Sequence, residues 1–213
     1  MKIVSLILAR GGSKGIPKKN IYPIAGKPLL FYSLNASQKS NVNETWVSTD
    51  CPEIKKVALA YDAKVLDRPN DISCDTSQSE EALLHFAEQI DFDIMVFIQP
   101  TSPLLLSQDI NNGISLLLDK KYDSVFSVYK EHWVPRWSLS SEPINWDIAH
   151  RPRRQDVQEN YVENGAFYIT YRNTLLNSQL RYSGNIGCFE MPLLRSFQID
   201  TLEDIDVINK LMI

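Results

Sequence analysis

The chain has 213 residues, of which 44% are hydrophobic and 23% charged, a composition typical of a globular domain with a sizeable core. Its formal net charge of −4 gives no basic surface and argues against nucleic-acid binding. Three scattered cysteines argue against a disulfide framework or zinc site, and no apolar run approaches the roughly 18 residues of a membrane span. The opening apolar run is too short for a signal peptide, so we expect a cytoplasmic protein.

The first predicted element is a buried strand over residues 3–8, which is short and rich in β-branched residues. The loop that follows, residues 9–20, contains glycines and four cations but no acidic residue. Its glycines are Gly11, Gly12 and Gly15, and its cations are Arg10, Lys14, Lys18 and Lys19. Glycines let backbone N–H groups approach a ligand, and fixed cations attract phosphate. The loop fits neither standard nucleotide fingerprint, yet its chemistry favours anion binding over a plain solvated loop.

Helices and strands then alternate. Leucines at helical spacing follow Pro28, a strand is predicted over 44–49, a helix over 52–60 and a short strand over 63–66. Strands that alternate with helices of this length predict βαβ units with right-handed crossovers. We therefore expect an α/β protein with a Rossmann-like, mainly parallel sheet flanked by helices.

The middle of the chain continues this pattern. Ser77 and Glu80 have the spacing of a capping box, with Ser77 as the N-cap of an amphipathic helix. An almost wholly apolar strand over 93–98 ends in a rigid polar loop, residues 99–103. A helix capped by Ser107 comes next and leads into a strand over 124–128.

Periodicity is lost from about residue 130 to residue 160. This stretch holds Trp133, Trp137, Trp146, Pro135, Pro143, Pro152, Arg151, Arg153 and Arg154. Exposed tryptophan and arginine suit an interface, whereas buried tryptophan is simply core, and composition alone weighs the two equally. We predict an irregular arm inserted into a single domain that spans residues 1–213.

The C-terminal part returns to strands. One is predicted over 163–170 and another over 186–191, and an acidic turn then precedes a terminal helix. Thr201 is the predicted N-cap of that helix, with Asp204 at its third position.

The loop sequence Ala-Arg-Gly-Gly-Ser-Lys-Gly-Ile-Pro-Lys-Lys-Asn resembles the signature of the CMP-sugar synthetases. Seven further motifs follow in the order of bacterial acylneuraminate cytidylyltransferases: Gly-Lys-Pro at 26–28, Ser-Thr-Asp at 48–50, Arg-Pro at 68–69, Gln-Pro-Thr-Ser-Pro at 99–103, Arg-Pro-Arg-Arg-Gln at 151–155, Asn-Gly-Ala-Phe-Tyr-Ile at 164–169 and Ile-Asp-Thr at 199–201. The resemblance covers essentially the whole chain. It implies a fold of the nucleotide-diphospho-sugar transferase type and a homodimer whose arm contributes to the partner's site.

The implied reaction is nucleotidyl transfer, in which the anomeric hydroxyl of an N-acylneuraminate attacks the α-phosphate of CTP and releases pyrophosphate. The loop at 99–103 favours the sialic-acid branch of the family. A legionaminate-type sugar and Kdo or amino-Kdo are the alternative substrates. An inactive nucleotide-binding regulatory protein is the alternative of another class.

The resemblance also implies a set of site residues. Arg10, Lys14 and Lys19 would hold the triphosphate and act in catalysis with Asp200. The nucleotide-binding set is Ala9, Gly11, Gly12, Ser13, Asn20, Arg68 and Ser79, of which Ser79 could equally be an exposed first-turn residue. The sugar-binding set is Gln99, Arg153, Arg154, Asn164 and Tyr168. Because Phe167 and Tyr168 alternate across a strand, at least one of them should face the core.

Nucleotidyl transfer from CTP needs Mg²⁺. The family commonly has two aspartates that flank one residue before the last helix, but this chain has Gln198-Ile199-Asp200. Asp200 alone can hold a hydrated Mg²⁺, and Gln198 offers a neutral carbonyl oxygen directly or through water. The departure implies weaker metal binding or a different sugar preference. No histidine stands out as a general base, so we expect the metal to lower the pKa of the attacking hydroxyl.

Overall fold

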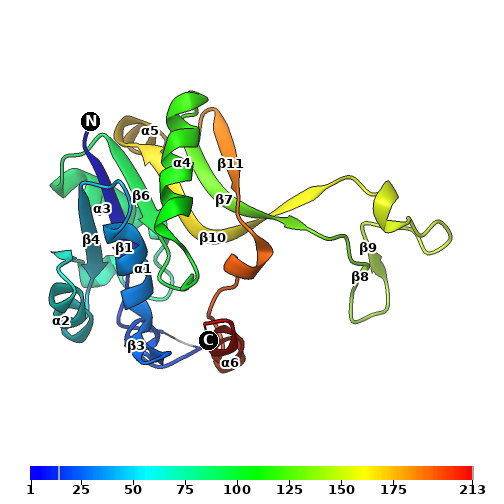
Figure 1. The fold of residues 1–213 in the computed structure, drawn as a ribbon, viewed down its shortest axis with the longest axis horizontal. Helices are drawn as coiled ribbons and strands as arrows, with labels where there is room; N and C mark the ends of the chain where they lie inside the picture. The colour runs from blue at the N-terminus through cyan, green and yellow to red at the C-terminus, as the bar shows by residue number, and fades with distance from the viewer. Residues whose placement is uncertain (14, 213) are drawn as a thin grey trace.

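The computed structural model describes residues 1–13 and 15–212 and contains a seven-stranded sheet of order β11-β7-β10-β6-β1-β4-β5 (Figure 1). Its strands are β1 (Ile3–Leu8), β4 (Glu44–Thr49), β5 (Lys64–Asp67), β6 (Ile94–Ile98), β7 (Ser124–Glu131), β10 (Asn160–Tyr171) and β11 (Ile186–Glu190). β1 is parallel to both of its neighbours, β4 and β6. Every residue of β6 is buried, which explains its continuous apolar sequence.

β10 is antiparallel to both β6 and β7, whereas β11 is parallel to β7 and β5 is parallel to β4. The sheet is therefore mixed but mainly parallel, as expected. The pairing of β10 with β7 shifts register between Glu163 and Tyr168, which marks a bulge. This bulge contains Gly165, whose φ of +66° is a conformation that favours glycine.

Helices cover both faces of the sheet (Figure 1). They are α1 (Leu29–Gln38), α2 (Pro52–Ala60), α3 (Ser79–Gln89), α4 (Ser107–Asp119), α5 (Arg172–Ser178) and α6 (Leu202–Leu211). One core cluster joins α1 and α4 to the sheet through Leu34 and Ile110, and a second joins α3 and α5 to the other face through Phe86 and Leu175. A third, smaller cluster packs α6 against the glycine loop through Ile16 and Ile205.

The helix starts differ in part from the sequence prediction. α3 begins two residues after Ser77, and its capping contact runs from the Gln78 N–H to the Glu81 carboxylate at 3.1 Å, so the predicted Ser77–Glu80 box is wrong. Ser107 is the first residue of α4 rather than its cap. Thr201 does cap α6, because its hydroxyl accepts from the Asp204 N–H at 3.3 Å.

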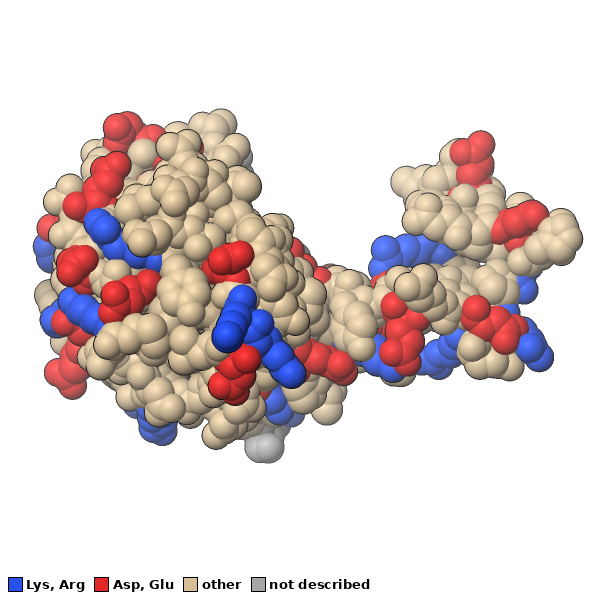
Figure 2. Space-filling view, turned by 90° about the horizontal axis from the view of Figure 1, so that it is seen from above, with Lys and Arg blue, Asp and Glu red and all other residues tan. Residues whose placement is uncertain are grey.

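Residues 130–160 form the arm. β7 and β10 continue beyond the sheet as a two-stranded ribbon that carries the short strands β8 (Arg136–Trp137) and β9 (Pro143–Ile144) (Figure 1). Figure 2 shows the arm standing away from the body of the molecule on a narrow neck. Its exposed apolar side chains include Val134, Trp137, Leu139, Ile144 and Ile148. The irregular arm expected from the sequence is therefore present as a projecting ribbon.

None of the helices in the described part of the chain combines the length and the hydropathy that a membrane crossing requires.

Candidate functional site

The cavity that gathers most of the predicted site residues, called the main cavity below, lies at the carboxyl ends of β1 and β6, where the glycine loop, the loop after β6 and the segment before α6 meet. Its volume is about 520 Å³. The predicted site residues that line it are Arg10, Ser13, Lys19, Asn20, Ser79, Gln99, Gln198 and Asp200. Residues from separate parts of the sequence thus converge on one cavity at the ligand-binding edge of the sheet.

A smaller cavity of about 270 Å³ adjoins it and is lined by Arg68 and by residues 72–79 in part. Leu8, Arg10 and Ser79 line both cavities and so mark their junction. Arg68 is buried, and its guanidinium donates to the Ser48 carbonyl at 2.6 Å and the Ser48 hydroxyl at 3.0 Å. Burial lowers the pKa of Arg68 to about 10, and the charge of Arg10 acts in the same direction.

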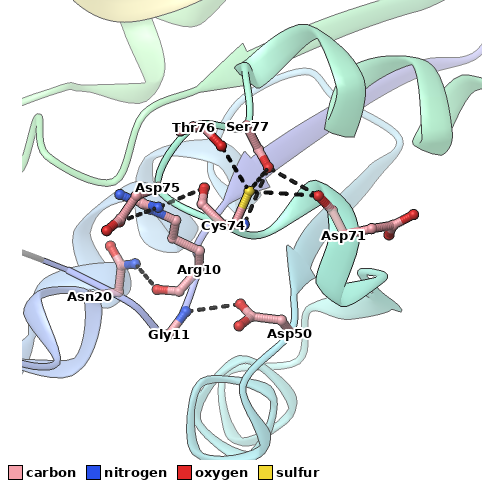
Figure 3. A network of polar contacts seen from close by, with 9 residues as sticks. All are labelled: Arg10, Gly11, Asn20, Asp50, Asp71, Cys74, Asp75, Thr76 and Ser77. Carbon is pink, nitrogen blue, oxygen red and sulfur yellow. Dashed lines mark hydrogen bonds and ion pairs between the residues drawn. The ribbon is translucent and has the colours of Figure 1, made fainter.

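Backbone and side-chain contacts fix the shape of the glycine loop (Figure 3). The Gly11 N–H donates to Asp50 Oδ1 at 2.9 Å, and a Cβ at Gly11 would lie 2.9 Å from Cys51 Cβ. The buried Asn20 amide donates to the Arg10 carbonyl at 3.0 Å. Asn20 therefore braces the loop as well as lining the main cavity, a role that the sequence did not reveal.

The three described cations of the loop, Arg10, Lys18 and Lys19, already have partners. Arg10 Nη1 contacts the Cys74 carbonyl and the Asp75 carboxylate, each at 2.9 Å (Figure 3). Lys19 Nζ lies 2.8 Å from Asp200 Oδ1 and 3.2 Å from the Ile199 carbonyl. Lys18 pairs instead with Glu53 at 3.1 Å, outside the cavity lining. A polyphosphate that enters the cavity would compete with carboxylates for Arg10 and Lys19.

The other predicted loop residues differ in how exposed they are to solvent. Ala9 is buried, and its N–H donates to the Ser48 carbonyl at 3.0 Å. A Cβ added at Gly12 would have no atom within 4 Å, so this glycine faces open space. Lys14 lies outside the described residues.

The start of α3 is held at the cavity by a largely buried ion pair that sequence reasoning missed. Glu80, next to Ser79, receives two hydrogen bonds from Arg181 at 2.6 and 2.9 Å. The Arg181 guanidinium also lies over the rings of Phe97 and Tyr168, at 5.8 and 5.2 Å from their centroids. Glu80 and Arg181 are about a hundred residues apart, and no local pattern in the sequence links them.

Two predicted sugar-binding residues, Asn164 and Tyr168, lie behind the cavity wall. The Asn164 side chain is buried, accepts from the Ser127 hydroxyl at 2.5 Å and donates to Ser196 Oγ at 2.9 Å. The Tyr168 ring stacks on Phe97 with centroids 5.3 Å apart, and its hydroxyl donates to Glu163. Burial raises the pKa of Tyr168, and Glu163 adds to the effect. Phe97, rather than Asn164 or Tyr168, lines the cavity at this point.

The two predicted arginines of the arm also lie outside both cavities. Arg153 is bound by Asp156 through contacts of 2.6 and 3.0 Å, and both Arg153 and Arg154 are exposed. Within a single chain they do not meet Gln99 or Asp200. Their assignment to the sugar remains a prediction that depends on a partner subunit.

Asp200 is the candidate metal ligand. Its side chain is 66% exposed at the cavity. The Gln198 amide, in contrast, donates to the Asn164 carbonyl. Within the described residues, no group of three or more histidine, cysteine or acidic side chains is arranged to hold a metal ion. One accessible carboxylate fits a hydrated Mg²⁺ that takes its other ligands from phosphate and water.

A mainly parallel α/β sheet with a cationic glycine loop and a carboxylate around one strand-end cavity is in keeping with the nucleotidyltransferase class. A family model described as cytidylyltransferase matches residues 4–212. The chain belongs to this cytidylyltransferase family, as its sequence motifs indicated.

Named relatives agree with this family. The chain is 43% identical to N-acylneuraminate cytidylyltransferase A of Danio rerio, over 96% of this chain and 49% of the relative. It is 31% identical to N-acylneuraminate cytidylyltransferase of Streptococcus agalactiae serotype V, over 96% of this chain and 52% of the relative. The chain thus spans about half the length of these relatives. Pseudaminic acid cytidylyltransferase of Campylobacter jejuni serotype O:23/36 is 29% identical, over 97% of this chain and 94% of the relative.

The fold is shared with a solved structure of CMP:2-keto-3-deoxy-manno-octonic acid synthetase complexed with CTP. The TM-score is 0.77 at 21% identity, covering 100% of this chain and 98% of the other.

Proposed function

We propose that the protein is a CTP-dependent synthetase that makes the CMP-activated form of a sialic-acid-type, nine-carbon 2-ulosonic acid. The observation that carries the proposal is the convergence of Arg10, Lys19, Gln99 and Asp200 on one cavity in a member of the cytidylyltransferase family. Cations suit a triphosphate, a carboxamide suits a sugar, and a carboxylate suits Mg²⁺. The names of the vertebrate and streptococcal relatives support N-acylneuraminate as the first substrate to test.

In the proposed reaction the anomeric oxygen of the sugar forms a bond to the α-phosphorus of CTP. The bond between that phosphorus and the bridging oxygen breaks, pyrophosphate leaves, and the hydroxyl proton passes to solvent. Arg10 and Lys19, together with Lys14, hold the triphosphate and offset the charge that grows on pyrophosphate. Arg10 is suited to this position because it lines both cavities and can bind phosphate bidentately.

The smaller cavity is the proposed nucleoside site. Arg68 and Ser79 line it, and its junction with the main cavity at Arg10 suits a nucleotide that passes from base to phosphates. The buried Arg68 is fixed by Ser48, so it offers a rigid wall rather than a mobile cation. Of the loop glycines, Gly15 lines the main cavity, where the phosphates would lie.

Asp200 would hold the divalent cation. When bound, Mg²⁺ would neutralise phosphate charge and lower the pKa of the attacking hydroxyl. Lys19 must then exchange its contact with the Asp200 carboxylate for one with phosphate. This exchange keeps each charged group paired before and after the substrate enters.

The arm supports a homodimer as the working form. It projects from the body and exposes apolar residues such as Leu139 and Ile148, which a partner would cover. Arg153 or Arg154 would then bind the sugar carboxylate in the partner's site.

A cytoplasmic location is part of the proposal, and the free thiols of all three cysteines are in keeping with a reducing compartment.

The test is to incubate the purified protein with CTP, Mg²⁺ and one sugar at a time, and to measure pyrophosphate release. The panel contains N-acetylneuraminate, a legionaminate-type sugar, pseudaminate and Kdo. We expect the largest kcat/KM with a nine-carbon sugar. A higher kcat/KM with Kdo would indicate a CMP-Kdo synthetase instead. CTP binding without turnover of any sugar would instead support the regulatory protein and refute the enzyme.

A further inference from the structure

Gln198 and Asp200 line the same cavity but have different neighbours. The Asp200 carboxylate contacts Lys19 on the side of the glycine loop. The Gln198 amide instead donates to the main-chain carbonyl of Asn164 in β10. Because that carbonyl can only accept, the nitrogen of the Gln198 amide must face it, and the amide oxygen is left as the acceptor.

Gln198 shares this place with a second carboxamide. The bulge residue Gly165 lies beneath both glutamines, since a Cβ built there would clash with Gln198 Nε2 and lie 2.7 Å from Gln99 Oε1. Gln99 also lines the main cavity, and its N–H donates to the Ala166 carbonyl at 3.3 Å. The two carboxamides therefore pack over the same glycine and face the same cavity.

The support beneath Gln198 is rigid. Asn164 is 4% exposed and its side chain is held by Ser127 in β7 and Ser196 in the segment before α6. Its carbonyl is therefore a fixed anchor for Gln198. A fixed, uncharged carboxamide with a spare acceptor can accept from a hydroxyl or N–H group of a ligand, and it attracts a cation less strongly than a carboxylate would.

We propose that Gln198 is a sugar-specificity residue. Together with Gln99 it forms a pair of carboxamides that hydrogen-bond the hydroxyl or acylamino groups of the sugar. Asp200 is then left as the metal ligand. This inference rests on the proposed function. It explains how the chain can lack a second carboxylate before α6: the position contributes to the sugar half of the cavity instead.

The experiment compares Gln198→Ala with the wild type and with Gln89→Ala, a matched change at an exposed end of α3. Three quantities are measured: KM for N-acetylneuraminate, KM for CTP, and the Kd of Mn²⁺ in the presence of CTP, by electron paramagnetic resonance. We expect the sugar KM of Gln198→Ala to rise about tenfold, as for the loss of one hydrogen bond. The CTP KM and the Mn²⁺ Kd should stay within about twofold of wild type.

A double-mutant cycle compares Gln198→Ala, Gln99→Ala and the variant with both substitutions. The thermal unfolding midpoint of each variant shows whether its structure is retained. If the two glutamines bind one sugar, their effects on the sugar KM are not additive. Three results would each overturn the inference: an Mn²⁺ Kd that rises more than twofold, an unchanged sugar KM, or strictly additive effects of the two substitutions on the sugar KM. In each case, turnover by the wild-type protein would still support the proposed function. A wild-type protein that turns over no sugar refutes the proposed function and this inference together.

Discussion

Asp200 is the residue on which the proposed metal chemistry depends. We expect Asp200→Asn to lower kcat at least about a hundredfold, because it removes the accessible carboxylate at the cavity. Stability should change little, since an exposed ion pair such as Lys19–Asp200 contributes only about 0–1 kcal/mol. Pyrophosphate release and thermal unfolding measure the two effects. Asp206→Asn, an exposed change within α6, is the control, and an Asp200→Asn variant with normal turnover would refute the metal assignment.

Cys74 gives a second residue-level test, because its thiol lies at the smaller cavity and its carbonyl accepts from Arg10 (Figure 3). Hydrogen bonds with Ser77 and Thr76 lower the pKa of this thiol to about 7. A lowered pKa favours the thiolate, so the alkylation rate should rise with pH and reach half its maximum near pH 7.

Burial raises the pKa of Cys188, which should therefore react only at higher pH and serves as the internal reference. Iodoacetamide labelling followed by peptide mass spectrometry gives both rates. CTP should slow the labelling of Cys74 and leave that of Cys188 unchanged. Equal protection of both thiols, or of neither, would argue against a nucleoside in the smaller cavity.

The position of a candidate site residue was predictable where a polar side chain follows a strand end. Arg10, Gln99 and Asp200 sit in loops, and such loops meet at one edge of a parallel sheet. Asn164 and Tyr168 were not predictable in the same way. They lie on β10, which has a strand on each side and helices on both faces, so polar groups there are satisfied internally.

At the scale of elements, the glycine loop must touch the segment before α6. A Cβ at Gly15 would lie 2.5 Å from the Asp200 carbonyl, a main-chain atom that cannot rotate away. We expect Gly15→Ala to push the two segments apart, to disturb the Lys19–Asp200 pair and to raise the KM for CTP about tenfold or more.

Gly12 provides the matched control for this loop. A Cβ at Gly12 meets no atom within 4 Å, so Gly12→Ala should keep a CTP KM within about threefold of wild type. Steady-state kinetics on both variants decide the matter. If the two alanine variants behaved alike, loop flexibility rather than contact with Asp200 would explain the glycines.

Element type followed from hydrophobic pattern for β1, β6 and α2, because their burial is regular along the sequence. The direction of β10 did not, since strand order depends on contacts between distant residues. The predicted start of α3 was wrong because Ser77, Gln78 and Ser79 can each precede a helix. The contact between Gln78 and Glu81 decides which of them does so in the structure.

At the scale of the whole molecule, the loss of periodicity after residue 130 coincides with the ribbon that projects from the body (Figure 1). Composition alone weighed an interface and a core role for this stretch equally, and only the family resemblance favoured a dimer.

Light scattering should give a dimer mass, and Leu139→Glu combined with Ile148→Glu should shift the protein toward monomer, since both side chains are exposed on the arm.

The dimer proposal makes a sharper demand, because Arg153 or Arg154 would act in the partner's site while Asp200 acts in its own. Homodimers that carry Arg153→Ala together with Arg154→Ala should be nearly inactive, and so should Asp200→Asn homodimers. When equal amounts are unfolded and refolded together, half of the dimers are mixed, and each mixed dimer has one site with both changes and one site with neither. Pyrophosphate release should therefore recover to about a quarter of the wild-type rate, as two-fold symmetry requires. If the arginines acted within their own chain, every site in a mixed dimer would carry one defect, and the refolded mixture would stay as inactive as its parents.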